Sequence, residues 1–189
     1  MMPVLVLGSN SPRRKELLTK AGYEFGIRAS DVDESLPEGI SPEDAVLMLS
    51  KRKSEAISLN EEEVLLTSDT VVAKGQEILG KPSSFEEARD YLHSLSGKQH
   101  DVWTAVTLRD AHTAKSFAVR TRVTFFSLEE KEIIRYIESG EAWDKAGGYG
   151  IQGKGAIFVD EIQGDYYSVV GLPLSRVVRA LRDFDVYPS

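Results

Sequence analysis

The segment VLLTSDTVVA at residues 64–73 constrains the fold of this chain more than any other feature. It is apolar and rich in β-branched residues, which predicts a buried strand. The turn KGQ at residues 74–76 leads into EILG, so we expect a short hairpin here. Because strands and helices are mixed in order and several strands form hairpins, the sequence predicts an α/β fold with a mixed twisted sheet and flanking helices.

Cap residues, glycines and periodicity predict the other elements. We expect strands at residues 4–8, 23–30, 103–111, 116–126, 156–162 and 165–170, and helices at residues 12–21, 42–59, 85–96, 128–139 and 173–184. Ser127 is the expected N-cap of the helix at residues 128–139. No internal repeat and no linker rich in Pro, Gly or Ser divides the chain, so residues 1–189 are expected to form a single domain.

Composition excludes several classes of protein. The 189 residues include no cysteine, which excludes disulfides, thiolate nucleophiles and cysteine-ligated zinc. The net charge of −7 argues against nucleic acid or an anionic membrane as a partner, because such binding depends on neutralising phosphates with Lys and Arg. The apolar runs are too short to span a bilayer, and the N-terminus lacks the pattern of a signal peptide. We therefore expect a cytoplasmic protein.

Two arginines stand at the start of the first expected helix, in LGSNSPRRKELLTKAG. Ser11 is a good N-cap and Pro12 suits the first helical position, so Arg13 and Arg14 fall in the first turn. A helix N-terminus carries partial positive charge and unpaired N–H groups, and cations are mildly disfavoured there. Two guanidinium groups at this place would strengthen a phosphate-binding site. The alternative is that both arginines extend into solvent.

A carboxylate interrupts the apolar run at Asp69, in TSDTVV. Burying a carboxylate is costly unless it is paired, hydrogen-bonded or bound to a metal. Beside a phosphate, Asp69 would hold Mg²⁺ or accept the proton of an attacking water. The alternative is a structural aspartate at the end of the strand, hydrogen-bonded to Ser68, Thr70 or a loop. The sequence contains no GxSxG motif, so water is the expected nucleophile.

The most glycine-dense segment is WDKAGGYGIQGKG at residues 143–155. It matches GxGxxG and nearly matches a P-loop, but a strand is expected after it instead of a helix, so neither motif applies. Its backbone can still approach a ligand closely, and Gln152 can both donate to and accept from a base edge. The alternative is a connector without a ligand.

Other polar residues carry weaker signals. Lys81 and Lys98 lie on loops next to helices, where an ammonium can reach phosphate oxygens, but single surface lysines are usually only solvated. The three histidines, at positions 93, 100 and 112, lack the close pairing of a metal site.

Six motifs in order resemble the Maf family of nucleoside triphosphate pyrophosphatases: SNSPRRKELL, SDTVV, GKP, SGKQHDVWT, WDKAGGYGIQG and GDYYSVVGLPL. The resemblance runs from about Leu5 to Phe184. It implies a homodimeric α/β protein with two lobes around a cleft, similar in fold to the inosine triphosphate pyrophosphatases. It also implies hydrolysis of a nucleoside triphosphate to the monophosphate and pyrophosphate with a divalent metal, Mg²⁺ or Mn²⁺. The combination of SPRR, SDT and GYGIQG is similar to the branch that acts on dTTP and UTP, and modified pyrimidine nucleotides are alternative substrates.

Position by position, the resemblance implies roles for particular side chains. Asp69 matches the proton acceptor and is a candidate metal ligand, whereas Arg13, Thr70 and Gln152 match the residues associated with substrate choice. Five further residues would line the same cleft: Ser9, Arg14, Glu34, Lys53 and Lys81. Because members of the family have been linked to cell-division arrest, a nucleotide-binding regulator of cell division that acts without turnover is an alternative function.

Overall fold

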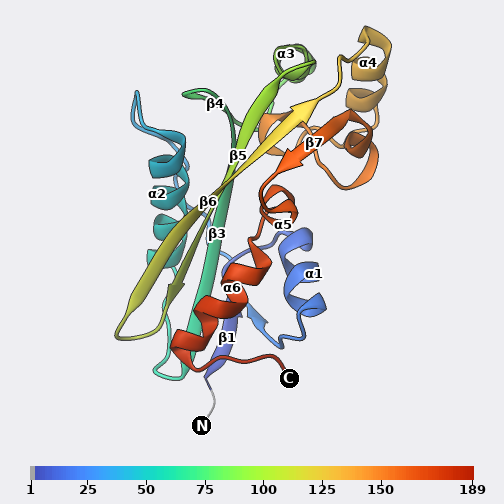
Figure 1. The fold of residues 1–189 in the computed structure, drawn as a ribbon. Helices are drawn as coiled ribbons and strands as arrows, with labels where there is room; N and C mark the ends of the chain where they lie inside the picture. The colour runs from blue at the N-terminus through green and yellow to red at the C-terminus, as the bar shows by residue number, and fades with distance from the viewer. Residues whose placement is uncertain (1–2) are drawn as a thin grey trace.

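The computed structural model describes residues 3–189, which form one mixed sheet with helices on both faces (Figure 1). The strands in this part of the chain are β1 (Val4–Leu7), β2 (Gly26–Ile27), β3 (Glu63–Lys74), β4 (Glu77–Leu79), β5 (Gln99–Arg109), β6 (Ala114–Phe125) and β7 (Val159–Gln163). The α-helices are α1 (Pro12–Lys20), α2 (Pro42–Glu55), α3 (Phe85–Leu95), α4 (Glu130–Glu138), α5 (Tyr166–Val170) and α6 (Leu174–Leu181). The predicted α/β fold with a mixed sheet is confirmed.

The strand order leaves one edge of β3 open near its centre. The sheet runs β2-β1-β3-β5-β6-β7, and β4 pairs with β3 outside this path. β1 is parallel to β3 and pairs with it at Glu63–Leu66, whereas β4 is antiparallel and pairs at Val72–Lys74. Among the described residues, no strand pairs with this edge between Leu66 and Val72. A ligand can therefore reach the middle of β3 from the side.

Both faces of β3 are buried, which explains its continuous apolar sequence. Successive side chains of a strand point to opposite faces. Leu66 packs in the cluster that contains Leu18 of α1 and Val177 of α6. Val71 packs instead against Val46 of α2, which covers the opposite face (Figure 1). A strand covered on both sides loses the alternation of apolar and polar residues that marks a half-exposed strand.

Two large clusters of buried side chains correspond to the two lobes that the family resemblance implies. One cluster includes Leu18 and Leu66, where α1 and α6 cover one end of the sheet. The other includes Leu92, Phe125 and Ile133, where α3 and α4 pack at the other end. The long strands β3, β5 and β6 run through both regions, so the lobes share one continuous sheet (Figure 1).

Residues 165–170, for which the sequence predicts a strand, form the helix α5, so that prediction is wrong. Asp165 is its N-cap: Oδ1 accepts from the Tyr167 N–H at 3.1 Å, and Oδ2 accepts from the Ser168 hydroxyl at 2.7 Å. Gly171 ends the helix with φ of 131°, a conformation that L side chains rarely adopt. These two ends outweigh the strand preference of Tyr and Val in between.

Other boundaries differ from the prediction because tertiary pairing decides them. The strand expected at residues 156–162 is displaced to β7, since Gly153–Phe158 forms a 3₁₀ segment. The strand expected at residues 23–30 is reduced to β2, which pairs with β1 over two residues only. The helix α2 ends at Glu55, short of residue 59.

The cap of α4 also differs from the prediction. Glu129, not Ser127, is the N-cap, and it forms a reciprocal capping box with Glu132: the Glu129 N–H donates to Oε2 of Glu132 at 2.8 Å. A longer carboxylate at this position replaces the serine cap that the local pattern favours. Separately, no helix within residues 3–189 is long and apolar enough to cross a membrane.

Candidate active site

A cavity of about 400 Å³ lies beside the open edge of β3. Its lining comes from the α1 end of the molecule and from the segment after α4, so the fold brings distant parts of the chain together. All nine residues that the resemblance assigns to the cleft line it: Ser9, Arg13, Arg14, Glu34, Lys53, Asp69, Thr70, Lys81 and Gln152. The volume lies within the range of sites that bind small molecules.

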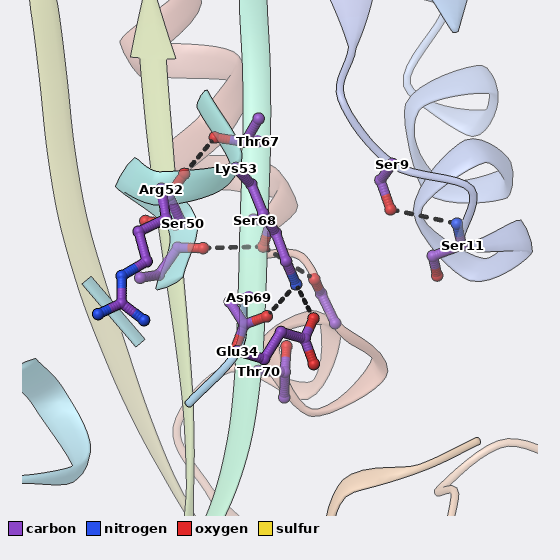
Figure 2. Close-up of polar contacts among 12 residues, drawn as sticks. Ser9, Ser11, Glu34, Ser50, Arg52, Lys53, Thr67, Ser68, Asp69 and Thr70 are labelled. Atoms are coloured by element: carbon purple, nitrogen blue, oxygen red, sulfur yellow. Dashed lines mark hydrogen bonds and ion pairs between the residues drawn. The ribbon is translucent and has the colours of Figure 1, made fainter. Parts of the chain in front are cut away.

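Lys53 of α2 extends toward β3, and its Nζ lies between two carboxylates (Figure 2). Nζ donates to Oδ1 of Asp69 at 2.5 Å and pairs with Oε1 of Glu34 at 2.8 Å. Burial alone would lower the pKa of Lys53, but the two carboxylates outweigh it and hold that pKa above its usual value. Burial would likewise raise the pKa of Glu34, but Lys53 outweighs it and lowers that pKa. Lys53 and Glu34 are therefore both charged at neutral pH.

Asp69 lies in the middle of β3, not at its end, and 8% of its surface is exposed. Lys53 occupies its Oδ1, whereas no hydrogen bond within residues 3–189 engages its Oδ2. Thr67 and Asp69 face α2, where Thr67 donates to the Ser50 carbonyl at 2.7 Å. A carboxylate oxygen placed at the cavity in this way can accept a proton from water.

Arg14 reaches from α1 to the other face of β3. Its Nε donates to the Gly171 carbonyl at 2.8 Å, its Nη2 to Oγ1 of Thr70 at 3.3 Å, and its Nη1 to Oγ of Ser9 at 3.4 Å. Burial lowers the pKa of Arg14, but a guanidinium starts from so high a value that it stays charged. The alternative that both arginines extend into solvent is therefore wrong for Arg14.

The Thr70 hydroxyl belongs to a chain of hydrogen bonds in which the donor of each bond can be assigned. Oγ1 of Thr104 donates to the Ser168 carbonyl at 2.8 Å, which uses the only proton of that hydroxyl. Thr70 Oγ1 lies 2.9 Å from Thr104 Oγ1 and must then be the donor to it. Since Arg14 donates to Thr70, the remaining lone pair of Thr70 is an acceptor site at the cavity.

Arg13 has a different environment from Arg14. Its side chain is 28% exposed, and its Nη1 lies 3.3 Å from Oδ2 of Asp144. Lys145 donates to the other oxygen of Asp144 at 2.7 Å, and all three residues line the cavity. Neither Asp144 nor Lys145 is among the candidate site residues that the sequence supplied. Lys145 carried a weak signal, as one of the basic residues next to a glycine or a turn, whereas Asp144 carried none beyond its place at the start of the glycine-dense segment.

The lysines and histidines with weaker signals differ in their position relative to the cavity. Lys81 lines the cavity and pairs with no carboxylate in the described part of the chain, whereas Lys98 lies outside the cavity. His93 and His112 are exposed, away from the cavity. His100 is buried, with Nε2 2.6 Å from the hydroxyl oxygen of Tyr149, a residue of the cavity wall. Burial lowers the pKa of His100 to about 4.

Glu34 and Asp69 are the residues that fit a divalent cation. Both line the cavity, and Lys53 pairs with one oxygen of each, so a divalent cation would bind beside Lys53 through the carboxylate oxygens that Lys53 leaves free. Mg²⁺ and Mn²⁺ prefer oxygen ligands, and Mg²⁺ is commonly held by one or two carboxylates together with substrate phosphates and water. Residues 3–189 contain no group of three or more His, Asp or Glu side chains that could hold a metal ion. A cation here would therefore take its remaining ligands from the substrate and from water.

Comparison with known proteins agrees with this arrangement. A HAM1 protein from Coxiella burnetii has the same fold, with a TM-score of 0.52 at 16% identity over 96% of this chain and 100% of that one. A dTTP/UTP pyrophosphatase of Bacillus cereus strain G9842 is 49% identical over 186 residues, which cover 98% of this chain and 97% of the relative. A dTTP/UTP pyrophosphatase of Bacillus anthracis strain CDC 684 is 50% identical over the same coverage. Residues 4–184 match the model of Maf-like proteins, and the chain therefore belongs to the Maf family.

Proposed function

We propose that this chain hydrolyses dTTP and UTP to the nucleoside monophosphate and pyrophosphate. The observation that carries the proposal is a carboxylate, Asp69, buried on a central strand and facing a cavity whose wall holds several cations. The relatives named dTTP/UTP pyrophosphatase, similar over almost the whole chain, support the choice of substrate. Because the cavity draws on residues from Gly8 to Gly171, we treat residues 1–189 as one functional domain.

Asp69 acts in this proposal as a general base. Water in the cavity loses a proton to the free Oδ2 of Asp69 while its oxygen forms a bond to phosphorus. The phosphoanhydride bond between the α- and β-phosphates breaks, and its electron pair leaves with pyrophosphate. Lys53 holds the carboxylate in position through Oδ1. A base positioned in this way contributes about 10²- to 10⁴-fold to a rate.

The cations of the cavity bind and neutralise the phosphate groups. Arg14 and Lys81 are available to bind phosphate because neither is paired with a carboxylate within residues 3–189. The N-terminus of α1 adds N–H groups and partial positive charge next to them. A divalent cation held by Glu34 and Asp69 would supply further neutralisation of phosphate oxygens.

Thr70 and Gln152 select the base in this proposal. Uracil and thymine each present an N–H between two carbonyl oxygens. The acceptor site on Thr70 suits that N–H, whereas the amide of Gln152 can donate to a carbonyl oxygen. Cytosine lacks the N–H, so a site of this kind would discriminate against CTP.

The metal, the assembly and the location complete the proposal. Mg²⁺ or Mn²⁺ is the proposed cofactor, the proposed assembly is a homodimer, and the proposed location is the cytoplasm. The metal and the homodimer follow from the family resemblance, and the location is the expectation from composition. Light scattering coupled to gel filtration tests the dimer, and activity after chelation and metal return tests the cofactor.

The test of the function is pyrophosphate release from a panel of nucleoside triphosphates, with Mg²⁺ or Mn²⁺, by the wild type and by Asp69→Asn. We expect release from dTTP and UTP, little from CTP, and a loss of at least about 100-fold in kcat for Asp69→Asn with nucleotide binding retained. Near-normal turnover by Asp69→Asn would show that another group is the base. Nucleotide binding without release from any member of the panel would instead support the regulator that acts without turnover.

A further inference from the structure

Asp144 bridges two cations of the cavity wall. Its Oδ2 lies 3.3 Å from Nη1 of Arg13, and its Oδ1 accepts from Nζ of Lys145 at 2.7 Å. Arg13 belongs to α1, whereas Asp144 and Lys145 lie 131 and 132 positions further along, in the segment after α4. The carboxylate therefore joins the two sides of the cavity.

Lys145 is held more firmly than the carboxylate that it pairs with. The side chain of Lys145 is only 16% exposed, and its Nζ also donates to the Glu141 carbonyl at 2.7 Å. Its stem packs on Gly150: a Cβ on that glycine would lie 2.5 Å from Cε of Lys145. Asp144 is 64% exposed, so it can turn into water at little cost. Lys145 is thus a fixed part of the wall, whereas Asp144 is a movable one.

Asp144 is charged in this state. Its partial burial would raise its pKa, but Lys145 and Arg13 outweigh that effect and lower it. Five cations line the cavity: Arg13, Arg14, Lys53, Lys81 and Lys145. At neutral pH the Asp144 carboxylate therefore pairs with two of them, Arg13 and Lys145. Phosphate oxygens that approach Arg13 or Lys145 meet this negative charge at the same place, and like charges at such distances repel.

We propose that Asp144 is a built-in competitor of the substrate's phosphate groups, and that Lys145 is a phosphate-binding residue which Asp144 occupies until the substrate arrives. Binding then requires an exchange, in which the phosphate chain replaces the Asp144 carboxylate on Arg13 and Lys145. The triphosphate chain carries more negative charge than the monophosphate product, so it replaces the Asp144 carboxylate more readily than the product does. The ion pairs of Asp144 therefore favour ligands of higher negative charge and aid release of the monophosphate product.

This inference rests on the proposed function in one respect, that a polyphosphate occupies the cavity. Its test is isothermal titration calorimetry with inorganic triphosphate, which carries the phosphate chain without a base. We expect Asp144→Asn to bind it about three- to tenfold more tightly than the wild type, the size of effect that one or two exposed ion pairs produce. We expect Lys145→Met to bind it more weakly by a similar factor. The gain in affinity should shrink as salt is added, because exposed charges are screened.

A matched control is Asp183→Asn. Asp183 is 57% exposed, close to the 64% of Asp144, and it accepts from Lys115 at 2.6 Å outside the cavity. That variant should bind inorganic triphosphate like the wild type. Unchanged or weaker binding by Asp144→Asn would overturn the proposal that Asp144 competes with phosphate groups. An absence of binding by all variants would overturn it as well. Normal binding by Lys145→Met would show that Lys145 does not bind phosphate. Since calorimetry needs no turnover, failure of nucleotide hydrolysis would contradict the proposed function and leave this result standing.

Discussion

The Nζ of Lys53 lies 2.5 Å from Oδ1 of Asp69 and 2.8 Å from Oε1 of Glu34 (Figure 2). One ammonium on α2 thus binds the carboxylate of Asp69 on β3 and that of Glu34 in the loop before α2. This arrangement resolves the cost of burying Asp69. The carboxylate is paired on one oxygen and available on the other, which is what a general base requires.

Lys53→Met should lower kcat by at least about 100-fold, because Asp69 and Glu34 would repel each other and lose their fixed positions. Lys51→Met is a matched control, because Lys51 is an exposed lysine of the same helix and does not line the cavity. Steady-state kinetics with UTP compares them. Equal kcat values for the two variants would contradict the role of Lys53.

Arg14→Lys should weaken both stability and substrate binding. A single ammonium cannot reach the three acceptors of the guanidinium, which are Gly171, Thr70 and Ser9. We expect a loss of about 1–3 kcal/mol in the free energy of unfolding by urea, together with a higher KM. Arg13→Lys, with one exposed partner, should leave the free energy of unfolding almost unchanged. Equal losses of stability in the two variants would show that Arg14 has no special structural role.

Because of His100, the free energy of unfolding should decrease as the pH falls. Burial holds its pKa at about 4, whereas an unfolded histidine titrates near 6.5, so the unfolded chain binds more protons between these values. Its contribution is complete above about pH 6.5 and declines as the pH falls toward 4. Between pH 7 and pH 5 the decline amounts to about 2 kcal/mol.

Urea unfolding of the wild type and of His100→Gln at several pH values measures this decline. Glutamine cannot titrate, so the variant should be less stable at pH 7 and should lose less stability on acidification. Parallel pH curves for the two proteins would exclude His100 as the source.

Gly150→Ala should raise KM for UTP with a smaller change in kcat. The new methyl group would lie 2.5 and 2.6 Å from Cε and Cδ of Lys145, so the Lys145 side chain has to leave its position in the cavity wall. Gly26→Ala, where the added Cβ meets nothing within 4 Å, is the control. If both variants show wild-type KM values, the position of Lys145 does not matter for binding.

Much of the fold could be predicted because its signals are local. Ser11 and Ser84 are the N-caps of α1 and α3, and their hydroxyls accept from backbone N–H groups of the first turn, as the cap patterns indicated. The long hairpin of β5 and β6 was also predicted, although β5 begins at Gln99, four residues before the expected strand. Residues 165–170 were mispredicted because Tyr and Val favour strands, while the deciding interactions are the cap bonds of Asp165.

By itself, the sequence determined the family, the mixture of strands and helices, and the residues that gather around the cavity, since apolar runs, caps and ordered motifs are properties of short segments. Only the tertiary structure decided how those residues interact. Asp69 meets Lys53 because α2 covers the face of β3 to which odd-numbered residues point, and Thr70 meets Arg14 because the next side chain points the other way. Asp144 could not be selected from its surroundings in the chain, because its partner Arg13 lies 131 positions away and comes near it only in the folded protein.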